Sequence, residues 1–315
     1  MPNLSGMPGC SLSTSGAPGC ATVARLLGGD PAGSATHMTS WLLVEQPGAW
    51  SATAVESTLA GVIDDERMHA LRTAGMRPLL IRRPGRHART GDGPVTVFVG
   101  SGRTGDHWLE RIELSDSSEL AELDLEAVAA GRRGHGQSVE GPLFLVCTHG
   151  AKDLCCAVLG RPVAKGLAAD HPGRVWEVSH VGGDRWAGNL LVVPDGYLHG
   201  QLGPGEATLV AKAALAGQVL PDHLRGRTPA VTGWEQSAEI AVRKHTGLTG
   251  VDDVTAVHVR HDGDTAARTV LVTARGRHFE VVVRHRDGIA ADGNRCTGHL
   301  ALAAYSAGEI RPAQG

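Results

Sequence analysis

The first clear pattern of apolar residues lies in the stretch WLLVEQPGAW, residues 41–50. Its continuous apolar run predicts a buried strand that ends at a Pro-Gly turn. Apolar residues then recur at the spacing of an amphipathic helix over about 54–73. Three more strands and a capped helix are expected after it, at residues 77–85, 95–102, 107–114 and 117–131.

A second block repeats this order of elements. It consists of a strand and loop at residues 143–152, a helix at 162–170, strands at 174–180, 189–196 and 197–203, and a helix at 206–217. WLLVEQPGAW aligns with LFLVCTHGAK, and RPLLIRRPGRH aligns with RVWEVSHVGGD, which indicates an internal duplication. In this alignment Glu45 stands where the second copy has Cys147, and Arg83 stands where it has His180. The first copy would therefore be a scaffold without the chemistry of the second.

A third segment begins near Pro221. WEQSAEIAVRKHTG, residues 234–247, predicts a helix that ends at Gly. Three later stretches, DVTAVHVRHDG, RTVLVTARG and RHFEVVVRHRDG, alternate apolar and polar residues as antiparallel strands with a solvent face do. The expected division of the chain is a flexible leader (1–37), two α/β halves (38–135 and 136–220) and a small α+β domain of unknown role (221–315).

The composition narrows the class of protein. A hydrophobic fraction of 42% suffices for ordinary globular cores, and a formal net charge of −3 argues against non-specific binding to nucleic acid or to anionic membranes. No apolar run approaches the ~20 residues that span a bilayer. The N-terminal stretch MPNLSGMPGCSLSTSGAPGC has neither the basic nor the apolar region of a secretory signal, so a cytoplasmic protein is expected.

Three cysteines follow closely on the strand expected at 143–147. In a reducing cytoplasm, such a group indicates metal or redox chemistry rather than structural disulfides. Cys147 and Cys156 are spaced Cys-x8-Cys, and after the next strand His180 and Asp184 are spaced His-x3-Asp. Because each pair follows the carboxyl end of a predicted strand, the two loops are expected to converge, as ligands around a metal must. The Cys-x2-Cys spacing of zinc ribbons and of thioredoxin dithiols is absent.

The stretches CTHGAKDLCCAVLGRP and WEVSHVGGDRWAGNLLVVPDG resemble the sucrase/ferredoxin-like proteins. This resemblance implies that the second half has the fold of a thioredoxin-like [2Fe–2S] ferredoxin, whose cluster is held by two Cys and by two His spaced His-x3-His. The pattern carries over to Cys147, Cys156 and His180, whereas the fourth position is Asp184 in this chain. Together with the duplication, the resemblance predicts an α/β fold of tandem thioredoxin-like units, followed by the small α+β domain.

The fourth ligand leaves alternatives open. Cys155, His149 or His199 could take the place of Asp184, and so could a partner molecule. Cys155 is otherwise expected to be a core residue or a spare thiol. The two glycines that follow Val181 suit the close approach of backbone N–H groups to cluster sulfurs, or an ordinary turn. No role is assigned to Cys10, Cys20 and Cys296.

The expected function is that of an iron–sulfur redox protein, which transfers one electron at a time or senses redox state together with an unidentified redox partner protein. Neither nucleic acid nor a membrane is expected as a partner. An electron carrier is favoured over an enzyme, and no pair of carboxylates suggests sucrose hydrolysis. Two alternatives remain: a thioredoxin-like thiol redox protein that uses Cys147 or Cys156 as its nucleophile, and an interaction protein without a cluster.

Overall fold

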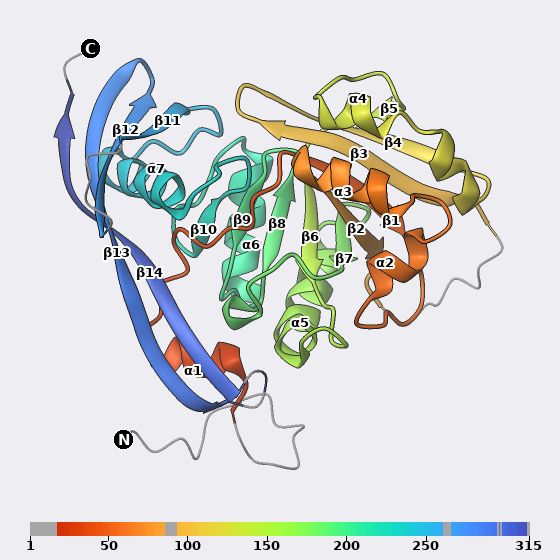
Figure 1. The fold of residues 1–315 in the computed structure, drawn as a ribbon, viewed down its shortest axis with the longest axis horizontal. Coiled ribbons are helices and arrows are strands. Elements are labelled where there is room, and N and C mark those ends of the chain that lie inside the picture. Colours follow the sequence, from red (N-terminus) through yellow and green to blue (C-terminus); the bar gives the residue numbers. More distant parts are fainter. Residues whose placement is uncertain (1–17, 86–92, 261–265, 295, 297, 314–315) are drawn as a thin grey trace.

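The computed structural model describes residues 18–85, 93–260, 266–294, 296 and 298–313. The protein has a mixed α/β fold with two sheets, a ten-stranded mixed sheet and a curved, four-stranded antiparallel sheet near the C-terminus (Figure 1). No helix within these residues is long and apolar enough to cross a membrane.

The ten-stranded sheet is built from two groups of strands. The first group is β1 (Ser40–Glu45), β2 (Met76–Arg82), β3 (Val95–Arg103), β4 (Asp106–Leu114) and β5 (Gln137–Ser138). The second group is β6 (Leu143–Cys147), β7 (Val175–Val178), β8 (Leu190–Val193), β9 (Tyr197–His199) and β10 (Leu224–Arg227). The strands lie in the order β10-β9-β8-β6-β7-β2-β1-β3-β4-β5.

The two groups arrange their strands in the same way. β1 pairs parallel with β2 and antiparallel with β3, just as β6 pairs parallel with β7 and antiparallel with β8. In each group the next strand, β4 or β9, extends the sheet antiparallel. The groups meet where β2 pairs antiparallel with β7, which places Ile81 opposite Val178. This repeated order is what an internal duplication would produce. β10 adds to the same sheet a strand from beyond residue 220.

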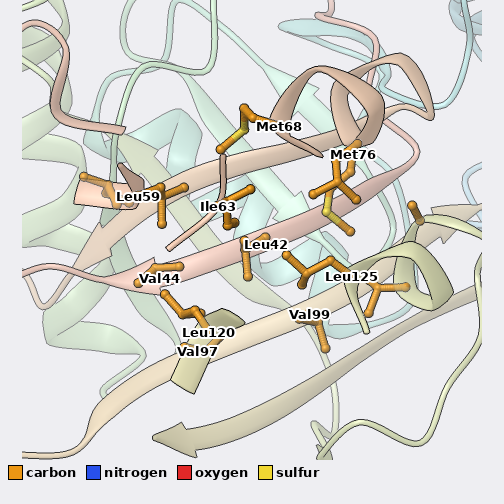
Figure 2. Close-up of a cluster of buried hydrophobic side chains, with 14 of the residues drawn as sticks. Leu42, Val44, Leu59, Ile63, Met68, Met76, Val97, Val99, Leu120 and Leu125 are labelled. Carbon is orange, nitrogen blue, oxygen red and sulfur yellow. The ribbon is translucent and has the colours of Figure 1, made fainter. Parts of the chain in front are cut away.

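Both faces of the central strands are buried. Leu42 of β1 faces a cluster that the helices of the first half complete, as Figure 2 shows. Its neighbour Leu43 faces a second cluster, which also contains Leu145 and Cys147 of β6 and therefore spans both halves. A strand that is buried on both faces has a continuous apolar sequence, which explains the unbroken runs WLLV and LFLV.

The first half contains α2 (Ala54–Leu59), α3 (Asp65–Thr73), the 3-10 turn η1 (Ser117–Glu122) and α4 (Leu125–Ala129). The expectation of one helix over 54–73 is wrong, because the chain breaks between α2 and α3. Gly61 adopts a φ of 83° in this break. The carboxylate of Asp64 then accepts a hydrogen bond from Arg67 N–H and starts α3.

Helix α5 (Leu154–Asp170) begins eight residues before the predicted start at Pro162. The carboxylate of Asp153 accepts a hydrogen bond from the backbone N–H of Cys155 at 2.7 Å and so caps the helix. Pro162 lies inside the helix, where an internal proline is unusual because it lacks the N–H donor. As a result, Cys155 and Cys156 occupy the first helical turn rather than a loop. Helix α6 (Pro204–Leu215) packs with α5 on Phe144 of β6.

The C-terminal part consists of α7 (Gly233–Thr246) packed on β11 (Val254–Arg260), β12 (Ala267–Ala274), β13 (Arg277–Asn294) and β14 (Gly298–Pro312). β14 is not predicted from the sequence, because GHLALAAYSAGEIRP is poor in the β-branched residues that mark strands. β13 and β14 form a long hairpin that reaches α1 (Cys20–Leu26), as Figure 1 shows. The segment expected to be a flexible leader thus includes a helix with buried residues.

Candidate metal centre

The large sheet brings two loops together at one edge. β6 ends at Cys147, and its parallel neighbour β7 places Val178 opposite that cysteine. His180 follows two residues after β7, so it leaves the sheet at the same edge. The first turn of α5 returns to this edge from the loop after β6 and carries Cys156. Strand order and helix start together therefore determine where the three side chains meet.

Cys147, Cys156 and His180 form a compact group, which we call the first centre. Their two sulfurs and one ring nitrogen all lie within 4.8 Å of one another. Cys156 Sγ lies 3.8 Å from Nδ1 of His180, and both cysteines have an exposed fraction of 0%. Three of the four predicted ligands are thus adjacent, and it is Cys156 rather than Cys155 that faces His180.

The two thiols of the first centre differ in acidity. The Cys147 pKa is lowered well below its usual value, because its sulfur accepts a hydrogen bond from Cys156 and further ones from His180 and the backbone N–H of His149, while burial opposes this shift. The Cys156 pKa is raised by its hydrogen bond to Cys147 and by burial. Of the two thiols, Cys147 is therefore the more acidic.

A buried arginine stands behind the first centre. Arg225 of β10 has an exposed fraction of 1% and donates hydrogen bonds to the carbonyl oxygen of Gly182 at 2.8 Å and to Oδ1 of Asn189 at 2.9 Å. It also donates to the backbone carbonyl oxygen and the hydroxyl of Ser34. Burial lowers the Arg225 pKa to about 9, and the negative charge of Cys147 partly offsets that effect. The guanidinium thus remains cationic at neutral pH.

The glycine pair makes room for this arginine. Gly182 and Gly183 have φ values of 85° and 71°, which L side chains rarely adopt. A Cβ atom on Gly183 would lie 2.3 Å from a guanidinium nitrogen of Arg225. The pair therefore lets the backbone turn closely around Arg225. Sequence analysis missed Arg225, because the stretch LRGR carries no recognisable motif.

His149 and His199, the histidines considered for the fourth ligand position, bind other groups. His149 Nδ1 accepts a hydrogen bond from the backbone N–H of His180 at 3.2 Å, and its Nε2 donates to the carbonyl oxygen of Ser51 at 2.7 Å. His149 thus holds the His180 loop against the first half. His199 lies in β9, and its Nε2 donates to the carbonyl oxygen of Leu220 at 3.1 Å.

Asp184 and Cys155 both lie close to another cysteine. Asp184, in the 3-10 turn η2 (Asp184–Trp186), is outside the compact group of the first centre, and its Oδ2 accepts a hydrogen bond from the thiol of Cys20 at 3.3 Å. Cys155 Sγ lies 3.7 Å from Cys20 Sγ and 3.6 Å from Cys296 Sγ. Sequence analysis assigned no role to Cys20 or Cys296, and Cys10 lies outside the described residues.

A cleft of about 990 Å³, lined by residues of both halves, lies next to the first centre. Its lining includes His149, Arg83 from the end of β2, and Arg161 and Lys165 from α5. Cationic side chains outnumber carboxylates along this lining. One of the carboxylates, Glu177, already accepts hydrogen bonds from Arg82 and from Thr148. The cleft therefore presents a positive surface beside the first centre.

The fold and the first centre define a mixed α/β protein with a candidate site for a thiophilic metal. Comparison with known families gives this class a name: the model of the sucrase/ferredoxin-like family matches residues 31–226. This match covers more than half of the 315 residues, and the chain belongs to the sucrase/ferredoxin-like family. It extends from just after α1 to β10. Neither the search of the curated proteins nor the search of the solved structures found a match.

Proposed function

We propose that this protein is an iron–sulfur redox protein, which transfers single electrons or senses redox state through a [2Fe–2S] cluster with mixed Cys/His ligation. The observation that carries the proposal is the convergence of two buried thiols and an imidazole at neighbouring strand ends, in a member of a ferredoxin-like family. When bound, such a cluster accepts and returns one electron at a time. In this proposal the two halves are tandem thioredoxin-like units, and the second one carries the chemistry.

The donor set suits such a cluster. Thiolate sulfur and imidazole nitrogen are ligands found on [2Fe–2S] irons, and the lowered pKa of Cys147 favours the thiolate form that ligation requires. Cys156 lies in the first turn of α5, where the positive end of the helix dipole favours negative charge. Arg225 adds a buried cation whose charge interacts with Cys147 and Cys156. The surroundings thus stabilise the net negative charge of a thiolate-bound cluster.

Cys147, Cys156 and His180 would hold the cluster, and Asp184 is the proposed fourth ligand. Asp184 follows directly after the glycine pair, but its carboxylate accepts a hydrogen bond from Cys20. Ligation would therefore require the Asp184 carboxylate to give up the hydrogen bond from Cys20 and to bind iron in its place. The remaining residues have positioning roles: His149 holds the backbone N–H of His180, and Arg225 holds the carbonyl oxygen of Gly182.

The second candidate function is that of a thiol redox protein, and the lowered pKa of the Cys147 thiol favours it. Against it stands the exposed fraction of 0% at both Cys147 and Cys156, since reactive cysteines are partly exposed. We therefore prefer the cluster.

The test is anaerobic purification of the full chain, followed by iron and acid-labile sulfide analysis and by visible and electron paramagnetic resonance spectroscopy. We expect iron and sulfide in equal amounts and a brown protein. Cys147→Ser and Cys156→Ser should lose both the colour and the iron, whereas the neighbouring Cys155→Ser should keep them. A colourless, iron-free protein whose Cys147 reacts rapidly with a thiol reagent would favour the second candidate. A colourless protein that tolerates Cys→Ala at both positions would be an interaction protein instead.

A further inference from the structure

Three cysteines from distant parts of the chain meet beside the first turn of α5. Cys20 Sγ lies 3.7 Å from Cys155 Sγ, which in turn lies 3.6 Å from Cys296 Sγ. Cys20 belongs to α1, and Cys296 lies in the chain between β13 and β14, whose hairpin reaches α1 in Figure 1. None of these three cysteines forms a disulfide in the described part of the chain. Packing of three separate elements is what brings them together.

A carboxylate completes the group. Asp153 uses Oδ1 to cap α5, and its Oδ2 lies 3.9 Å from Cys20 Sγ. The three sulfurs and a carboxylate oxygen of Asp153 all lie within 4.8 Å of one another. Cys20 and Cys155 are fully buried, in an apolar cluster that also contains Trp186 and Leu302. The surroundings therefore shield the sulfurs of Cys20 and Cys155 from solvent, whereas Cys296 is half-buried.

The sulfur separations fit a single tetrahedral ion. A zinc ion binds thiolate sulfur at about 2.3 Å, which places two sulfurs of one tetrahedron about 3.8 Å apart. The separations of 3.7 Å and 3.6 Å in the structure are close to that value. The backbone N–H of Cys20 also points at Cys296 Sγ at 3.4 Å, the kind of outer hydrogen bond that supports a metal-bound thiolate.

Other uses of these thiols fit less well. A disulfide would join two of the sulfurs at about 2.05 Å and leave the third sulfur and the Asp153 carboxylate without a role. One ion accounts for all four donors at once.

We propose that Cys20, Cys155, Cys296 and Asp153 form a second metal centre, which binds one thiophilic divalent cation of the Zn²⁺ class in tetrahedral geometry. Binding displaces the thiol protons to solvent and transfers no electron. Cys20 and Cys296 both lie outside the family match at residues 31–226. The ion would thus fasten the two terminal segments to the half that carries the first centre. This proposal does not rest on the iron–sulfur function.

The test isolates the second centre by removing the first. In the full chain carrying Cys147→Ser and Cys156→Ser, stripped of metal under reducing conditions, we expect one equivalent of Co²⁺ to bind. The spectrum should show the intense visible bands of tetrahedral cobalt and thiolate-to-cobalt charge transfer. Zn²⁺ should displace the Co²⁺ and raise the melting temperature. Adding Cys20→Ser or Cys296→Ser should abolish the bands, whereas Cys10→Ser should leave them unchanged.

Asp153→Asn separates ligation from folding. Asparagine is as good an N-cap as aspartate, so α5 should still form, but the anionic oxygen is lost. We expect at least a tenfold weaker Co²⁺ affinity with an unchanged circular dichroism spectrum. Absence of tetrahedral bands in the parent variant would overturn the proposal, as would bands that survive Cys20→Ser. A protein that binds no metal but forms a Cys20–Cys155 disulfide under mild oxidation would overturn it too. Mass spectrometry would detect this disulfide.

Discussion

Cys155 and Cys156 are neighbours in the chain, yet their sulfurs face different groups. Cys156 Sγ lies 3.8 Å from Nδ1 of His180, whereas Cys155 Sγ lies 3.7 Å from Cys20 Sγ. Both sit in the first turn of α5, where successive side chains point about 100° apart. A single helical turn therefore serves both proposed centres, and the capping residue Asp153 orients the two thiols together.

The contact between α5 and β6 should depend on one glycine. A Cβ atom at Gly160 would lie 2.1 Å from the carbonyl oxygen of Cys147. This oxygen belongs to the backbone of β6, so no side-chain rotation can relieve the clash. Gly160→Ala should therefore lower the free energy of unfolding by about 1–3 kcal/mol and reduce iron incorporation at the first centre.

Gly166→Ala in the same helix is the matched control, because its Cβ would meet only Pro204 at an ordinary 3.6 Å. Alanine is the better helix former, so this variant should be unchanged or more stable, by up to about 1 kcal/mol. Urea unfolding and iron analysis of both variants provide the measurement. Equal stabilities for the two would contradict the close approach of α5 to β6.

Arg225→Met should destabilise the protein and shift the potential of the first centre. The variant removes a buried cation and leaves the carbonyl oxygens of Gly182 and Ser34 with fewer donors. We expect a loss of about 3–5 kcal/mol in unfolding free energy. The reduction potential should fall in any fraction that keeps its cluster, because a nearby positive charge favours the added electron.

The control for Arg225 is Arg161→Met, which changes an exposed arginine in the cleft lining. This change should alter stability by no more than about 0.5 kcal/mol. An Arg225→Met protein as stable as the Arg161→Met protein would mean that the buried guanidinium does not support the glycine turn.

Asp184→His tests the fourth ligand. Replacing a carboxylate with a neutral imidazole removes one negative charge from the cluster, so the reduction potential should rise while the cluster is retained. Asp184→Asn provides the comparison that removes the charge without offering an imidazole. Redox titration of the three proteins is the measurement. If the wild-type and Asp184→His curves superimpose, the fourth position belongs to another group.

His199 should make the protein less stable in mild acid. Burial lowers its pKa from 6.5 to about 4, assisted by the neighbouring charge of His223 and opposed by the hydrogen bond to Leu220. Between these two values the unfolded chain binds a proton that the folded chain does not. Stability should therefore be unaffected above pH 6.5 and fall as the pH is lowered, by about 3 kcal/mol at pH 4 from this group.

The measurement for His199 is urea unfolding at a series of pH values. His199→Gln keeps a donor for the carbonyl oxygen of Leu220 but does not titrate, so its stability should depend less steeply on pH within this window. An identical slope in the variant and the wild type would assign the acid sensitivity to other groups.

The sequence was most informative where local patterns determine position. Apolar runs located β6 and β7, although β7 ends at Val178 rather than at the expected residue 180, and these strands determine where Cys147 and His180 lie. The start of α5 was misplaced, because Pro162 is a stronger visible signal than the cap at Asp153. Arg225 and the Cys20 group could not be found, since they depend on long-range packing. Cys20 and Cys155 are separated by 135 positions, and Cys155 and Cys296 by 141.

The buried cluster shared by both halves has a consequence for how the molecule is put together. β2 and β7 pair antiparallel at the junction of two similarly ordered groups of strands, and Leu43 of one group packs in the same core as Cys147 of the other. The chain thus resembles a homodimer whose two subunits have been joined end to end. In that arrangement the half without the candidate metal ligands acts as a permanent partner subunit, and it completes the core that it shares with the other half.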